Sequence, residues 1–138
     1  MYFLMFIFIK LFKCKGGDKV GYIVFENDKA FRHLVKEGFV YTLRAFNRST
    51  GVVKLKRNKA GKFIGFVKVE LVGNVKRAGG KYIVKTKDGD VDLNEFVPYS
   101  GFSSLDEWLS EFFKYYKTVG TVKLYKVTLV KLFYKFLF

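Results

Sequence analysis

The chain has 138 residues, half of them hydrophobic, and it carries 26 Lys and Arg against 12 Asp and Glu, a formal net charge of +14. A chain of this length buries roughly two thirds of its unfolded surface, which excludes a disordered polymer and a pair of large domains. The only cysteine, Cys14, excludes an internal disulfide and a multi-cysteine zinc site. We therefore expect a single domain over residues 1–138 with no cofactor.

The first nine residues, 1–9, form an uninterrupted apolar run. A helix needs about 20 apolar residues to cross a bilayer, and a secretory signal needs a basic start and a small-residue cleavage site. The run meets neither requirement, so we expect a buried edge strand within an apolar extension over residues 1–16. The missing signal and the unpaired Cys14 favour a cytoplasmic protein.

A strand and a short helix are expected next. Residues 19–25 are rich in β-branched and aromatic side chains, which favours a strand. Asn27 and Asp28 are helix-capping residues, and Gly38 stands where a helix would end. The apolar face of this helix would comprise Phe31, Leu34 and Val35.

Further extended segments follow the helix, with alternating or β-rich composition. Their ranges are 39–46, 52–56, 63–72 and 82–86. The last leads into Asp88-Gly89, a preferred hairpin turn, before Val91 and Leu93. Asp88, Asp90 and Asp92 are spaced like the start of a calcium loop, but Tyr99 occupies the twelfth position, so they predict a solvated strand face and no metal site.

The second helix is the best-specified element. Residues 104–107 form a capping-box pattern, with Ser104 at the cap and Glu107 three residues later. Apolar residues then recur with helical spacing, which predicts a stripe that packs on the sheet. The stripe comprises Leu105, Trp108, Leu109, Phe112 and Phe113.

The C-terminal region predicts a strand over residues 122–130, followed by an extension over 132–138 in which Lys alternates with aromatic residues. The two apolar ends could pair with one another or with a second copy of the chain, so homo-oligomerisation is one hypothesis. Membrane-surface contact through the same ends is a less favoured one. Altogether the pattern indicates an α+β protein with a small barrel of five to seven strands and two main flanking helices.

The positive charge is concentrated in one part of the chain. Residues 51–87 carry eleven positive side chains and only Glu70 as an acid, whereas residues 88–113 hold seven acids and no Lys or Arg. Such an imbalance attracts polyanions, of which nucleic acid is the commonest inside cells.

Several motifs occur in the order seen in one known family. They are Glu37-Gly38 at a helix end and the segments 41–44, 64–69, 101–109 and 124–127. Over about residues 20–131 the chain resembles a divergent ASCH domain, a family related to PUA domains. This resemblance implies a PUA-like β-barrel, a cleft beside the first helix, and a function linked to RNA.

Some members of that family are small amidohydrolases that act on acetylated cytidine. Thr42 and Arg44 match the Thr-x-Arg part of their motif, but the Lys that should follow the glycine is replaced by Phe39 and Val40. Neither side chain can take a proton from a hydroxyl or a water. The family's glutamate could correspond to Glu70, Glu95 or Glu107. We therefore assign no catalytic residue, and hydrolysis of a modified cytidine remains the alternative hypothesis.

The favoured hypothesis is RNA or other nucleic-acid binding. An Arg fork near Thr42 and Arg44, with Tyr41 and Phe46 as aromatic neighbours, would hold an unpaired base, and basic side chains beyond it would follow the phosphates. The predicted interface comprises Thr42, Arg44, Arg48, Lys54, Lys56, Arg57, Lys59 and Lys62. The lone His33 is expected to line a surface or cleft rather than to act as a catalytic base.

Overall fold

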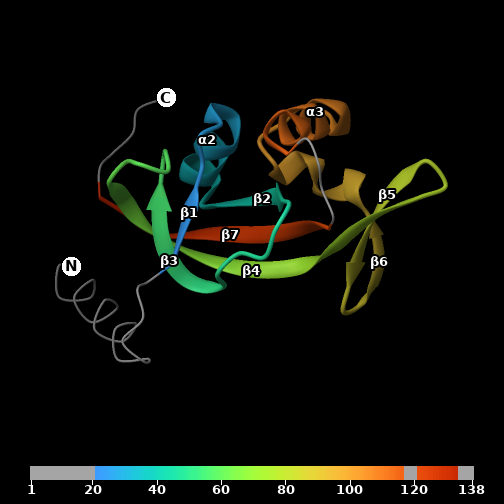
Figure 1. Cartoon of the computed structure of the whole chain (residues 1–138), viewed down its shortest axis with the longest axis horizontal. Helices are drawn as coiled ribbons and strands as arrows, with labels where there is room; N and C mark the ends of the chain where they lie inside the picture. Colours follow the sequence, from blue (N-terminus) through green and yellow to red (C-terminus); the bar gives the residue numbers. More distant parts are fainter. Residues whose placement is uncertain (1–20, 117–120, 134–138) are drawn as a thin grey trace.

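The computed structural model describes residues 21–116 and 121–133, which form an α+β fold. Within them a seven-stranded mixed sheet is accompanied by α2 (Asp28–Glu37), η1 (Leu93–Tyr99, a 3-10 helix) and α3 (Leu105–Tyr115). Figure 1 shows α2 and α3 on the same side of the sheet. The strands are β1 (Tyr22–Val24), β2 (Phe39–Arg44), β3 (Gly51–Lys56), β4 (Phe63–Ala78), β5 (Lys81–Thr86), β6 (Gly89–Asp92) and β7 (Val122–Leu132).

Strand β4 organises the sheet because it pairs with three other strands. Along one edge it pairs antiparallel with β7. Along the other edge its first half pairs with β3 and its second half pairs with β5. Strand β5 in turn pairs with β6. Strand β7 pairs with β2, and β1 pairs in parallel with β3. The order across the larger part of the sheet is therefore β1-β3-β4-β7-β2.

The sheet does not close into the expected barrel. Strands β1 and β2 end this order, and no pairing joins them in the part of the chain that the structure describes. In Figure 1, β1 and β3 stand steeply against β2 and β7. Strand β1 is only three residues long, and a side-chain-lined cavity separates it from β2. The fold is therefore a curved open sheet with an unpaired seam.

Both helices begin at the caps that the sequence predicted. Asn27 Oδ1 accepts a hydrogen bond from the Ala30 N–H at 3.1 Å, and Gly38 ends α2 with a φ of 84°. Ser104 Oγ accepts from the Glu107 N–H at 3.1 Å. The Glu107 carboxylate accepts in return from the N–H of Ser103. In a capping box this bond would come from the N–H of the cap residue itself, Ser104.

The buried faces of the helices largely agree with the predicted apolar stripes. Phe31 and Leu34 of α2 and Trp108 and Phe112 of α3 are buried in the main core. Phe113 is 45% exposed, so its expected packing on the sheet is wrong. The reason is geometric: the face of α3 that packs on the sheet is too narrow to include Phe113.

Several expected boundaries differ from the structure, and three of the differences have a clear course or cause. Strand β2 ends at Arg44 rather than at residue 46, and β4 continues six residues past the expected end at 72 to Ala78. A register shift between Leu71 and Gly73 lets β4 continue while it changes partners from β3 to β5. Leu93 begins η1 instead of extending β6, because Asp92 Oδ1 accepts from the Asn94 N–H and caps the helix.

Several predictions lie outside the described residues. They concern the strand over residues 1–9, Cys14, the first residues of the 19–25 strand and most of the 132–138 extension. The hypotheses of oligomerisation or membrane contact through the two ends lie there as well. Among residues 21–116 and 121–133, no helix has the length and hydrophobicity needed to cross a bilayer.

Gly73 should be essential for the change of partners along β4. A Cβ at this position would lie 2.1 Å from the backbone oxygen of Lys85 in β5, so Gly73→Ala forces two backbones apart. We expect a loss of about 1–3 kcal/mol or more in the free energy of unfolding, measured by urea denaturation. Gly61→Ala is the matched control, since its Cβ meets only the exposed side chain of Asn58. Equal effects of the two substitutions would contradict this account.

Candidate nucleic-acid interface

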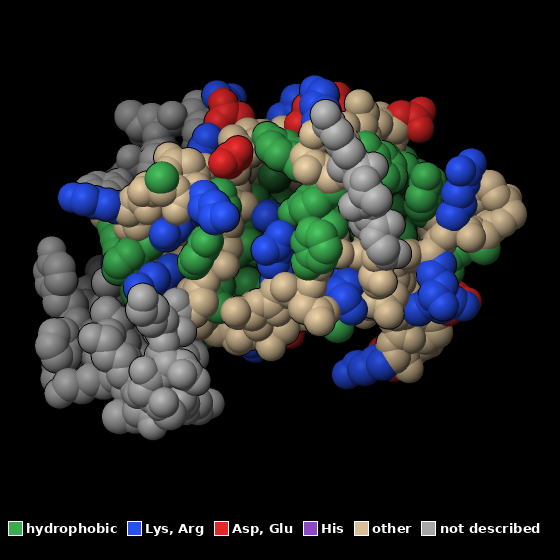
Figure 2. All heavy atoms as spheres, in the orientation of Figure 1, with side chains coloured by type: hydrophobic (Ala, Val, Ile, Leu, Met, Phe, Trp, Pro, Cys, Tyr) green, Lys and Arg blue, Asp and Glu red, His purple; other side chains and the backbone are tan. Residues whose placement is uncertain are grey.

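A cavity of about 590 Å³ lies in the seam between β1 and β2. Its size falls in the range of about 300–1,000 Å³ that is usual for ligand sites. Its walls come from β1 and the following loop, from the end of β2 and residues beyond it, and from α3. Figure 2 shows a hollow in the middle of the drawn face, with basic and hydrophobic side chains around it. The unclosed sheet thus leaves an opening large enough for a ligand.

Arg44 places a half-buried cation in the wall of this cavity. Its Nε donates to Thr42 Oγ1 at 3.2 Å, and its guanidinium carbon lies 4.8 Å from the centre of the Phe25 ring. Burial, assisted by the nearby charge of Arg48, lowers the pKa of the Arg44 guanidinium to about 10, and the Tyr116 phenol opposes this change. The side chain therefore stays charged at neutral pH.

Arg48 lies beside Arg44 and is incompletely satisfied. Its Nη2 donates to the Tyr116 hydroxyl at 3.0 Å, and its backbone N–H donates to the Tyr125 hydroxyl at 2.9 Å. Its Nε is buried without a hydrogen-bond partner. In the described residues neither Arg44 nor Arg48 forms an ion pair with a carboxylate. Together they offer charge and donors to an anion from outside the protein.

Aromatic side chains form much of the remaining wall. Phe25 and Trp108 are buried and face the cavity, as does Phe112. Tyr116 stacks on Phe112 with ring centres 4.8 Å apart. Trp108 is a core residue, as the sequence predicted, and it also contributes to the cavity surface.

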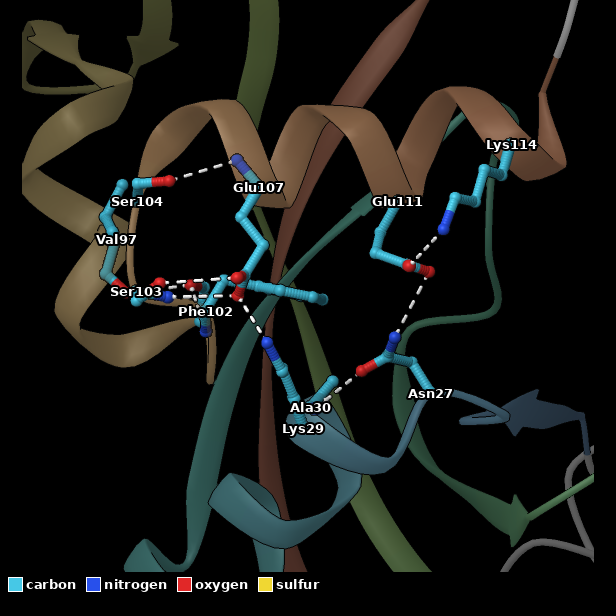
Figure 3. A network of polar contacts seen from close by, with 11 residues as sticks. Asn27, Lys29, Ala30, Val97, Phe102, Ser103, Ser104, Glu107, Glu111 and Lys114 are labelled. Atoms are coloured by element: carbon cyan, nitrogen blue, oxygen red, sulfur yellow. Dashed lines mark hydrogen bonds and ion pairs between the residues drawn. The ribbon is translucent and has the colours of Figure 1, made fainter.

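A polar network fixes α3 against the start of α2 (Figure 3). Asn27 Nδ2 donates to Glu111 Oε2 at 3.2 Å, and Lys114 Nζ pairs with Glu111 Oε1 at 2.8 Å. Lys29 pairs with Glu107 at 2.9 Å, and its hydrogen bond is the main reason that the pKa of Glu107 is lowered. Asn27 and Glu111 also line the cavity, so the network that joins the helices supplies polar groups to the site.

The predicted basic residues of β3 and the following hairpin lie in different surroundings. Lys59 lines the cavity, and Lys62 is exposed. Lys56 Nζ lies 4.4 Å from the centre of the Tyr22 ring, and Lys54 Nζ lies 4.9 Å from that of Phe63. Arg57 pairs with Asp28 at 2.6 Å, a hydrogen bond that lowers the pKa of that carboxyl. Arg57 is thus the residue of the predicted interface that already forms an ion pair with an acid.

Tyr41, a predicted neighbour of the site, and His33, which was expected to line a surface or cleft, both lie outside the cavity lining. Tyr41 does not line the cavity but packs on Phe96 and Tyr99, and burial is the largest cause of its raised pKa. His33 is half-buried against Phe39, its Nε2 has no partner, and burial lowers its pKa. Tyr41 faces away because successive residues of a strand point to opposite sides, and Thr42 takes the cavity side.

Sequence reasoning missed the two carboxylates of the site. Glu26 and Glu111, rather than Glu70, Glu95 or Glu107, line the cavity with Thr42. The position of Glu111 three residues after Trp108 would have placed both on one face of α3. The described residues contain no group of three or more His, Cys, Asp or Glu arranged to hold a metal ion.

No family model, curated protein or solved structure matches the chain. The site is therefore interpreted from its own geometry and chemistry.

If Arg44 and Arg48 form an anion site, inorganic pyrophosphate should raise the melting temperature of the protein. A ligand that binds only the folded state stabilises it by roughly 2.7 kcal/mol at 100 times its Kd. The Arg48→Ala variant should gain much less, because it lacks the partly unsatisfied guanidinium. Potassium chloride at matched ionic strength is the control in a thermal-shift measurement, and equal gains in both proteins would contradict the assignment.

Proposed function

We propose that the protein binds single-stranded nucleic acid, RNA in particular, with one unpaired nucleotide in the cavity. The observation that carries the proposal is the pair Arg44 and Arg48, which face an aromatic-walled cavity without a described carboxylate partner. Proteins recognise unpaired RNA mostly by stacking bases on aromatic rings and by binding phosphates with basic groups.

The roles within the cavity follow from the chemistry of its walls. The guanidinium groups suit a phosphate, since they offer several donors in a fixed plane. Phe25, Phe112 and Trp108 suit a base, which needs apolar contact on its faces. The Glu111 carboxylate can accept a hydrogen bond from the amino group of a base and so distinguish bases that carry one.

The hairpin after β3 extends this interface. Lys59 lines the cavity, and Lys56 and Lys62 belong to the same hairpin region. Exposed lysines of this kind bind the phosphate backbone without reading its sequence. We expect Arg57 to contribute less, because Asp28 already neutralises its charge.

The resemblance to ASCH domains also supports RNA as the ligand. In this proposal the curved sheet corresponds to a PUA-like barrel left open between β1 and β2, and the cavity corresponds to the cleft of that family. Thr42 and Arg44, the residues that carry part of the family motif, both line the cavity.

Binding of a fluorescein-labelled RNA octamer of mixed sequence, followed by anisotropy, tests the proposal. Arg48→Ala should weaken binding about 10-fold or more, because it removes a charged donor inside the site. Replacing Lys59 and Lys62 together by Ala should lower the slope of log Kd against log salt by about one per lost phosphate contact. Lys81→Ala, at the distant start of β5, is the control. An unchanged slope in the double variant would show that the hairpin is not part of the interface.

The alternative function is hydrolysis of an acetylated cytidine, and one observation favours it: Thr42, Lys59 and Glu111 line the same cavity. If it holds, purified protein should release acetate from N4-acetylcytidine, and Thr42→Ala and Glu111→Gln should each abolish the release. Chromatographic detection of cytidine and acetate provides the measurement. Absence of turnover at high enzyme concentration would leave binding as the function.

A further inference from the structure

We propose that the rim of the cavity holds the two bases next to the one inside, so that the ligand is a strand of at least three nucleotides rather than a free nucleoside. The inference rests on the proposed function and specifies its substrate class. It depends on two exposed aromatic residues: Tyr22, which lines the cavity from β1, and Phe46, which follows β2 and contacts the cavity-lining Tyr116.

Phe46 follows β2 directly and is 60% exposed. Its ring meets the Tyr116 ring at 6.2 Å with the planes 70° apart, and Tyr116 in turn lines the cavity and accepts a hydrogen bond from Arg48. A large part of the Phe46 ring is thus open to solvent beside a basic residue of the site. A base that leaves the cavity on this side would meet an aromatic ring and a guanidinium together.

Tyr22 provides the equivalent surface on the β1 side. It lines the cavity, is 42% exposed, and has Lys56 Nζ 4.4 Å from its ring centre. Lys56 Nζ donates to the Lys59 carbonyl at 3.4 Å but pairs with no carboxylate among the described residues, so it keeps donors and charge for a phosphate. The combination again brings together a stacking surface and a cation.

A single exposed aromatic side chain is common and needs no explanation. Here the exposed Tyr22 and Tyr115 line one cavity, and the exposed Phe46 contacts its wall at Tyr116. A cation without a carboxylate partner among the described residues accompanies two of them, Lys56 beside Tyr22 and Arg48 on the Tyr116 that Phe46 contacts. Alternating stacking surfaces and phosphate-binding groups are what a single strand requires, because every nucleotide has a flat base and one negative charge. A free nucleoside in the cavity would reach Tyr22 at most, because Phe46 lies outside the lining, whereas a strand would use both residues.

The mixed-sequence RNA octamer and the wild-type, Phe46→Ala and Tyr22→Ala proteins test the inference by anisotropy. Each substitution should weaken binding about 5- to 150-fold, the range expected for one lost base stack. Phe46→Trp should keep wild-type affinity, since it preserves the stacking surface. Tyr99→Ala is the matched control: Tyr99 is exposed and aromatic, and the Phe39 and Tyr41 rings that it contacts lie outside the cavity lining, so its loss should leave the affinity unchanged.

A second measurement compares ligand lengths as competitors of the octamer. Affinity for wild-type protein should rise from a mononucleotide to a trinucleotide, and Phe46→Ala should reduce that rise. If Phe46→Ala and Tyr22→Ala bind the octamer like wild type while Arg48→Ala weakens it, the rim assignment is overturned and the proposed function stands. If the wild-type protein does not bind the octamer at all, both proposals fail. Urea unfolding of each variant confirms that the exposed substitutions leave the fold intact.

Discussion

The seam between β1 and β2 is the constraint on which the site depends. If these strands paired, backbone hydrogen bonds would occupy the space that the cavity now fills. Side chains hold the two edges apart: Arg44 and Arg48 reach into the gap, and Tyr125 fixes the Arg48 backbone. The bond from Asn27 to Glu111 then ties α3 across the opening. Strand pairing on one side and helix contacts on the other therefore position every wall of the cavity.

The same arrangement costs stability in the free protein. Two neighbouring guanidinium groups repel one another, and burial disfavours the charged form of Arg44. Tyrosine hydroxyls and the Phe25 ring offset only part of this cost, since Arg48 Nε stays buried without a partner. Unsatisfied buried donors are rare in folded proteins. This donor belongs to a residue that lines the cavity, so its cost falls on the site.

Local signals in the sequence predicted the elements well, and long-range geometry was beyond them. Asn27, Gly38 and Ser104 define helix ends through bonds to residues nearby in the chain, so their roles could be predicted. Barrel closure depends on whether β1 meets β2 after the sheet has curved through β3, β4 and β7, and composition does not encode that curvature. The roles of Tyr41 and Glu111 depend on which face of β2 and α3 meets the cavity. Thr42 could be placed there only through the family resemblance.

The uneven charge along the chain gains a structural explanation. Among the acids of residues 88–113, Asp90 pairs with Lys85, Asp92 caps η1, and Glu107 pairs with Lys29. These acids stabilise local structure, so they do not neutralise the hairpin after β3. Glu111 alone among them lines the cavity, where Asn27 and Lys114 already bind it. Apart from Arg57, which pairs with Asp28, the positive side chains beside the seam form no ion pair with an acid in the described residues, so their charge is left to attract an anion.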